Sequence, residues 1–140
     1  MATRNMPQGL AAALALNPED SGESSLPKLQ AAAQRCRVIE IARAVRDAAF
    51  DDLQVSQGDL LSILDGKPTA RGDDCVEALA GALDQLGGGP FEVATIYWGI
   101  QGQEDGAAVL AETVRNATRV PETTTVFGGQ PHFDYVISLE

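Results

Sequence analysis

The side chains best suited to chemistry gather near the C-terminus, in residues 128–135, which read Gly-Gly-Gln-Pro-His-Phe-Asp-Tyr. His132 is the only histidine of the chain, so a Ser-His-Asp or Cys-His hydrolase would have to use it. A loop of this composition is also typical of recognition, since Gln130 and Tyr135 offer hydrogen bonds beside apolar surface. A turn that closes the core uses the same residue types, so these interpretations stay open.

The glycines and the proline of this segment predict a fixed shape. We expect Gly128 and Gly129 to adopt backbone conformations that are costly for other residues, and Pro131 to stiffen the return of the loop. If the loop recognises a partner, Gln130→Ala or His132→Ala should weaken binding and leave the melting temperature nearly unchanged. If it is only a turn, the same changes should leave binding alone.

Clustered carboxylates suggest metal binding at first sight, but their spacing does not match a calcium loop. Asp51 and Asp52 fit a turn. Asp73 and Asp74 fit the start of a helix, with Glu77 three residues after Asp74 in a capping pattern. We therefore expect no metal site in this chain.

Two glycine-rich stretches resemble phosphate loops only superficially. Residues 87–89 follow a helical pattern and precede a strand pattern, which is the reverse of the order in a nucleotide-binding loop. Residues 99–102 lie between a strand and a helix, but they have two glycines and lack the Lys-Ser/Thr of a P-loop. An anion at this second stretch is only weakly indicated, and we expect no cofactor in this chain.

The elements that position these residues divide the chain at residue 36. Residues 1–36 predict a helical segment, the remainder of a larger C-terminal region. Its first helix begins near Pro7 and ends at Asn17-Pro18, and after a polar loop over 19–25 a second helix begins near Pro27. Leu29, Ala32, Ala33 and Cys36 form one apolar stripe on it. Helices this short should dock on something.

Residues 37–140 predict an α/β domain, a mixed β-sheet with helices packed on it. Asp65-Gly66 is the strongest hairpin signal, and Pro68 places the return strand at an edge. The helix 106–118 should turn Leu110, Val114 and Ala117 inward. The strand-helix-strand run from 91 to 127 fits a parallel crossover. The expected elements are a strand from 38 (or a helix over 36–49), strands over 53–55, 60–64, 67–71, 91–98, 123–127 and 133–139, and helices over 73–87 and 106–118.

Composition excludes several classes of function. The 140 residues carry 20 acidic and 10 basic side chains, a net charge of −10, which argues against nucleic acid and anionic membranes as partners. No apolar run approaches a membrane span, and no signal peptide is visible. Two cysteines without paired spacing fit buried thiols in a reducing compartment, so we expect a cytoplasmic location.

A set of short segments stands in order along nearly the whole chain. They are Pro7-Gln8-Gly9-Leu10-Ala11-Ala12, Asn17-Pro18-Glu19, Ala44-Val45-Arg46-Asp47 (an expected strand), Gly58-Asp59 with Leu64-Asp65-Gly66-Lys67, Thr95-Ile96-Tyr97-Trp98-Gly99, Gly128-Gly129-Gln130-Pro131 and Tyr135-Val136-Ile137-Ser138-Leu139-Glu140. Together these segments resemble the C-terminal region of the fatty acid kinase catalytic subunit. Trp98 stands where that family usually has a tyrosine, and His132-Phe133-Asp134 replaces a more apolar stretch.

The resemblance implies a non-catalytic piece of an enzyme similar to dihydroxyacetone kinases. ATP and magnesium would bind a separate kinase domain, on the same or another chain. This chain would dock a DegV-type fatty-acid-binding protein that presents the acyl carboxylate for phosphorylation. We expect the partner-binding residues to be Gly128, Gly129, Gln130, Pro131, His132 and Tyr135. A homodimer is compatible with the sequence. The alternative is a stand-alone small-molecule hydrolase or phosphatase that uses His132 and the 128–135 loop.

Overall fold

The computed structural model describes residues 5–19, 21–87 and 89–140. None of the helices in these ranges has the length and apolar character that crossing a bilayer requires. In chain order the elements are α1 (Met6–Leu14), α2 (Gly22–Arg35), β1 (Arg37–Arg43), β2 (Ala48–Phe50), β3 (Leu53–Val55), β4 (Leu60–Leu64), β5 (Lys67–Gly72), α3 (Cys75–Gln85), β6 (Val93–Trp98), α4 (Glu104–Thr118), β7 (Glu122–Phe127) and β8 (Tyr135–Leu139).

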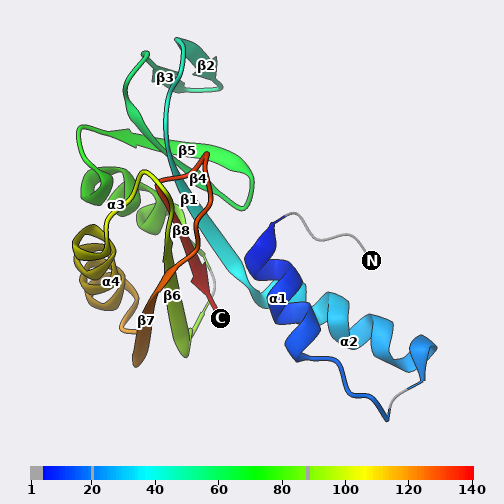
Figure 1. Cartoon of the computed structure of the whole chain (residues 1–140). Helices are drawn as coiled ribbons and strands as arrows, with labels where there is room; N and C mark the ends of the chain where they lie inside the picture. The colour runs from blue at the N-terminus through cyan, green and yellow to red at the C-terminus, as the bar shows by residue number, and fades with distance from the viewer. Residues whose placement is uncertain (1–4, 20, 88) are drawn as a thin grey trace.

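A mixed sheet of six strands forms the centre of the molecule, in the order β5-β4-β1-β8-β6-β7 (Figure 1). β6 and β7 are parallel and joined through α4, as the crossover pattern predicts, and the other neighbours are antiparallel. β2 and β3 form a separate two-stranded ribbon. The predicted fold class, a mixed α/β sheet preceded by a short helical segment, is confirmed.

The hydrophobic core lies between the sheet and helices α3 and α4, which share one of its faces (Figure 1). Strand register determines which side chains enter it, because alternate residues point to the same face. Burying each large aliphatic side chain contributes roughly 1.5–3 kcal/mol, so this layer dominates the stability of the domain. The fully buried residues on the two sides are Ile39, Ile41, Ile96, Ile137, Leu139, Leu79, Leu110 and Val114.

Two signals near the β4–β5 hairpin act as the sequence predicts. Asp65 and Gly66 have φ values of 51° and 86°, the left-handed conformations that a tight turn of this kind requires. β5 is an edge strand.

At the start of α3, the Asp74 side chain accepts a hydrogen bond from the Glu77 amide at 2.8 Å, and Glu77 accepts one from the Asp73 amide at 3.0 Å. Asp74 is therefore the helix-capping residue, and Asp73 takes part through its backbone amide.

The beginning of α2 differs from the prediction. The helix begins at Gly22 rather than near Pro27, so residues 22–25 are helical and not part of a loop. Ser21 caps the helix, and its side chain accepts a hydrogen bond from the Ser24 amide at 3.4 Å. Pro27 lies in the second turn, where it forgoes the bond to the Glu23 carbonyl. Serine residues suit loops as well as helix caps, which is why the sequence pattern misled.

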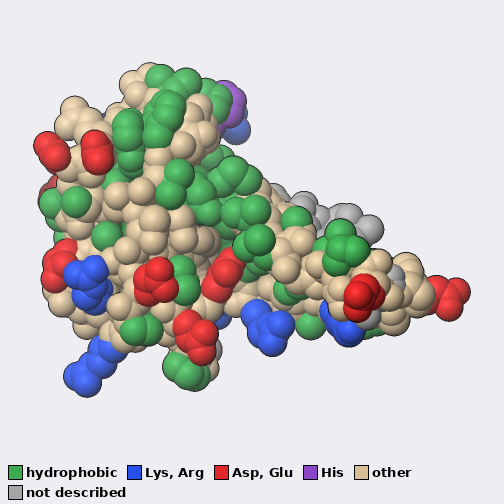
Figure 2. All heavy atoms as spheres, turned by 60° about the horizontal axis from the view of Figure 1, so that its bottom comes forward, with side chains coloured by type: hydrophobic (Ala, Val, Ile, Leu, Met, Phe, Trp, Pro, Cys, Tyr) green, Lys and Arg blue, Asp and Glu red, His purple; other side chains and the backbone are tan. Residues whose placement is uncertain are grey.

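The helical pair forms an arm beside the sheet (Figure 1). Ala11 of α1 packs on Val38 and Val136, on the sheet face opposite α3 and α4, and Cys36 completes this small cluster. Figure 2 shows the arm extending from the body of the domain with hydrophobic side chains on its surface. Met6 is 54% exposed. The arm therefore rests on the sheet through small residues and leaves larger apolar side chains accessible.

The strand expected from residue 38 is confirmed as β1, its helical alternative is excluded, and two further expectations are wrong. Residues 44–47 form a loop rather than a strand, and the pairing of β1 with β4 ends at Arg43 opposite Leu60. A helix over 36–49 does not occur, since β1 occupies the middle of the sheet. Ala117 is exposed, and Ala107 and Ala111 fill the inward positions of α4, which begins at Glu104.

Candidate functional site

The 128–135 segment lies where two parallel strands end together. β6 and β7 run in register from Val93 opposite Glu122 to Trp98 opposite Phe127. Since parallel strands end at the same edge of a sheet, the loop after β6 and the loop after β7 emerge side by side. Ligands of α/β proteins bind preferentially at such carboxyl ends. We call the exposed surface formed by Ile100, Phe127, Pro131 and His132 the rim.

Backbone hydrogen bonds fix these two loops to each other. The Gly128 amide donates to the Trp98 carbonyl at 2.9 Å, and the Ile100 amide donates to the Gln130 carbonyl at 3.1 Å. The Gln130 side chain is also engaged, because its Nε2 donates to the Tyr97 carbonyl at 2.9 Å. Gln130 therefore holds the loop, and its amide nitrogen is not free to be displayed to a partner.

Glycines allow the close approach on which this arrangement depends. A Cβ at Gly99 would lie 2.5 Å from the Gln130 carbonyl oxygen and nearer still to the Phe133 carbonyl oxygen. A Cβ at Gly128 would collide with the Gln130 side-chain oxygen. Only Gly129 of the predicted pair has a positive φ, 70°. The expectation for Gly128 is therefore corrected: its backbone is not left-handed, and an added Cβ would instead displace the Gln130 side chain.

Tyr135 points inward. It is 6% exposed, its hydroxyl accepts a hydrogen bond from the Gln103 amide at 3.1 Å, and it donates to the Gln103 carbonyl at 3.4 Å. Gln103 is the N-cap residue of α4 and its side chain makes no capping hydrogen bond, and the phenol satisfies the backbone amide of Gln103 itself. With Glu104 and Asp105 in the first turn, this helix start is unsuited to the anion that residues 99–102 weakly indicate.

The exposed part of the site is mostly apolar. Ile100 is 62% exposed and Phe127 is 58% exposed. The Phe127 ring lies 4.5 Å from the ring of Trp98, tilted by 48°, an arrangement that aromatic pairs favour. Pro131 and His132 are exposed beside them. His132 makes no hydrogen bond or ion pair with the described residues, so nothing in this geometry orients it as a catalytic base.

Sequence reasoning missed Ile100 and Phe127. The Gly-Ile-Gln-Gly stretch was considered only as an anion loop, and Phe127 only as the end of a strand. The sequence does contain a signal for both residues. Phe127 ends one strand of the crossover unit and precedes Gly128, and Ile100 follows the other strand after Gly99. Such a position brings side chains to the same edge of the sheet, where loops carry function.

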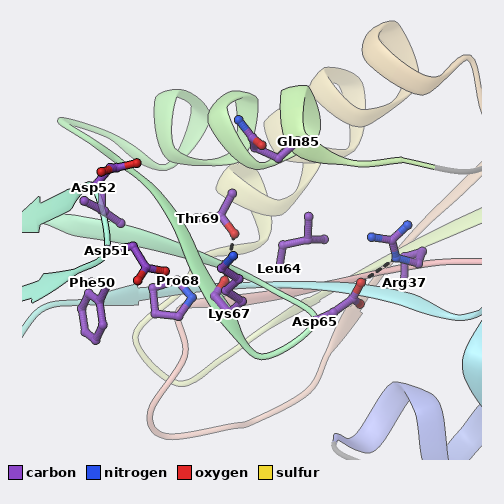
Figure 3. Close-up of a pocket in the computed structure, with 11 residues that line it drawn as sticks. Arg37, Phe50, Asp51, Asp52, Leu64, Asp65, Lys67, Pro68, Thr69 and Gln85 are labelled. Carbon is purple, nitrogen blue, oxygen red and sulfur yellow. Dashed lines mark hydrogen bonds and ion pairs between the residues drawn. The ribbon is translucent and has the colours of Figure 1, made fainter.

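A separate hollow of about 600 Å³ lies between the ribbon and β5 (Figure 3). At one end the Arg37 Nε is 2.6 Å from Asp65 Oδ2, and the other Asp65 oxygen accepts from the Val38 amide at 2.9 Å. Asp51 and Asp52 lie at the other end, away from that pair (Figure 3). Within the described residues no three His, Cys, Asp or Glu side chains converge to hold a metal. Arg37 and Asp65 therefore stabilise the β4–β5 hairpin rather than form part of a catalytic cluster.

Burial disfavours the charged forms of the ionisable groups near the other sheet face. Burial, together with the nearby Glu140, raises the pKa of Cys36 to about 12. Burial also raises the pKa of Tyr97 and, on β1, that of Glu40. Cys36 and Cys75 are free thiols, and the pKa of Cys75 is raised by its burial as well. A thiolate nucleophile is therefore unfavourable at either position.

Known proteins match nearly the whole chain. The FakA-like C-terminal family model, which describes the C-terminal part of a fatty acid kinase, matches residues 1–140. Protein YloV of Bacillus subtilis is 26% identical over 98% of this chain and 25% of its own length. An uncharacterized protein of Staphylococcus haemolyticus is 26% identical over 99% of this chain and 25% of its own. The chain thus spans a quarter of the length of these curated relatives.

Solved structures share the fold. A Thermotoga maritima protein described as revealing fatty acid binding function has a TM-score of 0.57 and 18% identity, with 96% of this chain and 53% of that chain covered. A DegV lipid-binding protein from Thermotoga maritima has a TM-score of 0.58 and 15% identity, with 96% and 54% covered. A fatty-acid-binding DegV family protein from Thermus thermophilus has a TM-score of 0.55 and 16% identity, with 96% and 56% covered.

Proposed function

The chain belongs to the FakA-like C-terminal family of fatty acid kinases, and from this membership we propose that it is a non-catalytic docking domain. In this proposal it binds a DegV-type fatty-acid-binding protein and holds it for ATP-dependent phosphorylation of the bound acyl group. The kinase domain, with its ATP and magnesium, lies elsewhere on the same or another chain. Such chemistry takes place in the cytoplasm, where the free thiols of Cys36 and Cys75 would stay reduced.

The observation that carries the proposal is the fixed rim at the ends of β6 and β7. Exposed apolar side chains on a rigid support suit docking, because little side-chain and loop entropy is lost on binding. Gln130 and Tyr135 contribute by holding the loops, through their bonds to Tyr97 and Gln103. Gly128 and Gly129 allow the turn, and the direct contacts come from the exposed members of the rim.

Electrostatics support a protein partner with a basic surface. The chain carries a net charge of −10, and Glu104 and Asp105 begin the helix next to the rim. Long-range attraction of this kind accelerates association and selects against acidic partners. Because phosphoryl transfer depends mainly on positioning and charge stabilisation, a domain that only positions the acyl-carrying partner contributes to rate without touching the phosphate.

Calorimetric titration of this chain with a palmitate-loaded DegV-type protein tests the proposal. We expect saturable binding without ATP or magnesium, weakened about tenfold or more by Ile100→Ala or His132→Ala. Val109→Ala is the matched control, since Val109 is an equally accessible aliphatic residue on α4, 54% exposed. Absence of binding by the unaltered chain, or loss of binding in the control alone, would contradict docking through the rim. Phosphatase or ATP turnover by the purified chain would contradict a non-catalytic role.

A further inference from the structure

One row of side chains crosses all six strands on the sheet face opposite α3 and α4. Ile39 and Ile41 point into the core below those helices, so Glu40 between them points to the other face. Residues directly opposite each other in the strand register share a face, which extends the row to both edges of the sheet. Glu40 is its only charged member. From β5 to β7 the row is Pro68, Ile63, Glu40, Val136, Tyr97 and Val126.

The Glu40 carboxylate has no partner within the described part of the chain. It makes no hydrogen bond or ion pair there. Arg71 lies on the same face in the neighbouring row, opposite Leu61, but it pairs with Asp59 at 3.3 Å. The Glu40 side chain is nevertheless partly buried, and this burial raises its pKa. A carboxylate removed from water without a cation or a donor is unfavourable, so ionised Glu40 lowers the stability of the isolated domain.

The row leads from Glu40 to the rim over apolar side chains. Tyr97 is partly exposed, and Val126 is 40% exposed and directly precedes the rim residue Phe127. The small cluster on which α1 rests covers the middle of the row, and Phe133 of the 128–135 loop packs against that cluster while staying partly exposed itself. A partner seated on the rim therefore has a continuous apolar path across the sheet face, with one unpaired carboxylate at its end.

We propose that Glu40 pairs with a lysine or arginine side chain of the DegV-type partner, whose apolar side chains cover Tyr97 and Phe133 beside it. This inference rests on the proposed docking function and names the chemistry that selects the partner. The cation satisfies the carboxylate, and the apolar contacts exclude water from the pair, which strengthens the attraction. The net charge of −10 acts in the same direction, because it favours a basic partner and disfavours a second copy of this chain.

Glu40→Gln separates binding from folding, because the amide keeps the shape of the side chain and removes its charge. In the isolated chain the change should raise the melting temperature at pH 7, since an unpaired, partly buried carboxylate is lost. Binding to the palmitate-loaded DegV-type protein should weaken about tenfold or more and become less sensitive to salt. Glu122→Gln is the matched control: it removes an exposed carboxylate at the end of β7 away from the rim, and should change neither quantity.

Thermal unfolding of each variant, and calorimetric titration with the loaded DegV-type protein at low and high salt, measure these effects. If the unaltered chain does not bind, the docking function fails and the Glu40 pair with it. If the unaltered chain binds, Ile100→Ala weakens binding and Glu40→Gln does not, the pair alone is overturned and docking through the rim stands. Equal weakening by Glu40→Gln and Glu122→Gln would show an effect of net charge only. A lower melting temperature of Glu40→Gln would overturn the claim that the carboxylate is unsatisfied in the free domain.

Discussion

The two edges of the six-stranded sheet are built differently, because features that hinder a further strand occur at β5 and not among the residues of β7. In the pairing of β4 with β5, the register shifts between Ser62 and Ile63, and Pro68 lacks a backbone N–H donor. Arg71 of β5 also forms an ion pair with Asp59, with Nη1 3.3 Å from Oδ2. β7 has none of these devices among its residues, and at its end the rim leaves Ile100 and Phe127 exposed. One edge is closed to further pairing, and the other stays accessible to partners.

The largest effect should distinguish the inner and outer amides of β7. The Gly128 amide donates to Trp98 of β6, and the side to which the backbone groups point changes at every residue. Thr124→Pro removes an amide that faces β6, and should destabilise the domain by about 3 kcal/mol. Thr125→Pro removes an amide that faces outward, where proline is tolerated, and should cost less than about 1 kcal/mol. Urea unfolding of both variants gives the two values. Equal losses would show that the outer edge of β7 is not free as described.

The next largest loss of stability should follow from disturbing the close backbone contact between the two loops that support the rim. Gly99→Ala places a Cβ against the carbonyl oxygens of Phe133 and Gln130, and should destabilise the domain by about 2 kcal/mol. Gly87→Ala is the control at the other side of the molecule, because nothing lies within 4 Å of its added Cβ. Thermal unfolding compares them. A Gly99 variant as stable as the control would mean that the two loops are not locked together.

A smaller, pH-dependent effect should appear at Asp59, which pairs with Arg71 on the β5 edge. The backbone amide of Ser56, with help from Arg71, lowers the pKa of Asp59. A carboxyl whose pKa is lowered in the folded state stabilises it above the unfolded pKa, and this contribution is lost as pH falls through the folded value. Asp59→Asn should therefore be less stable than the unaltered chain at pH 7, and the gap should close in acid. A gap that is constant with pH would rule out this role of the charge.

Local rules explain how much of the fold the sequence could predict. Asp65-Gly66 and the Asp74–Glu77 cap were predictable because their geometry depends on neighbouring residues alone. The start of α2 was missed because serine suits both loops and helix caps. Long-range contacts were beyond reach: Gly99 meets Phe133, and the Tyr135 hydroxyl reaches Gln103, only because the sheet brings distant segments together.

The sequence predicted the position of the 128–135 loop better than the orientation of its side chains. The 128–135 segment does lie at the carboxyl ends of the parallel strands, where the sequence placed a special loop. The side chains expected to face a partner, Gln130 and Tyr135, instead hold the loop through internal hydrogen bonds. A long polar side chain can hydrogen-bond to buried backbone groups of its own chain or to a partner protein. The sequence does not show which of these two bonds it makes.

Amide hydrogen exchange with and without a palmitate-loaded DegV-type protein tests the docking role most directly. The account predicts slower exchange on complex formation at Ile100 and over residues 128–134, and unchanged exchange in β5 and in the ribbon of β2 and β3. Protection confined to β5 and the ribbon, or no protection at saturating partner, would contradict the assignment of the β7 end as the docking surface.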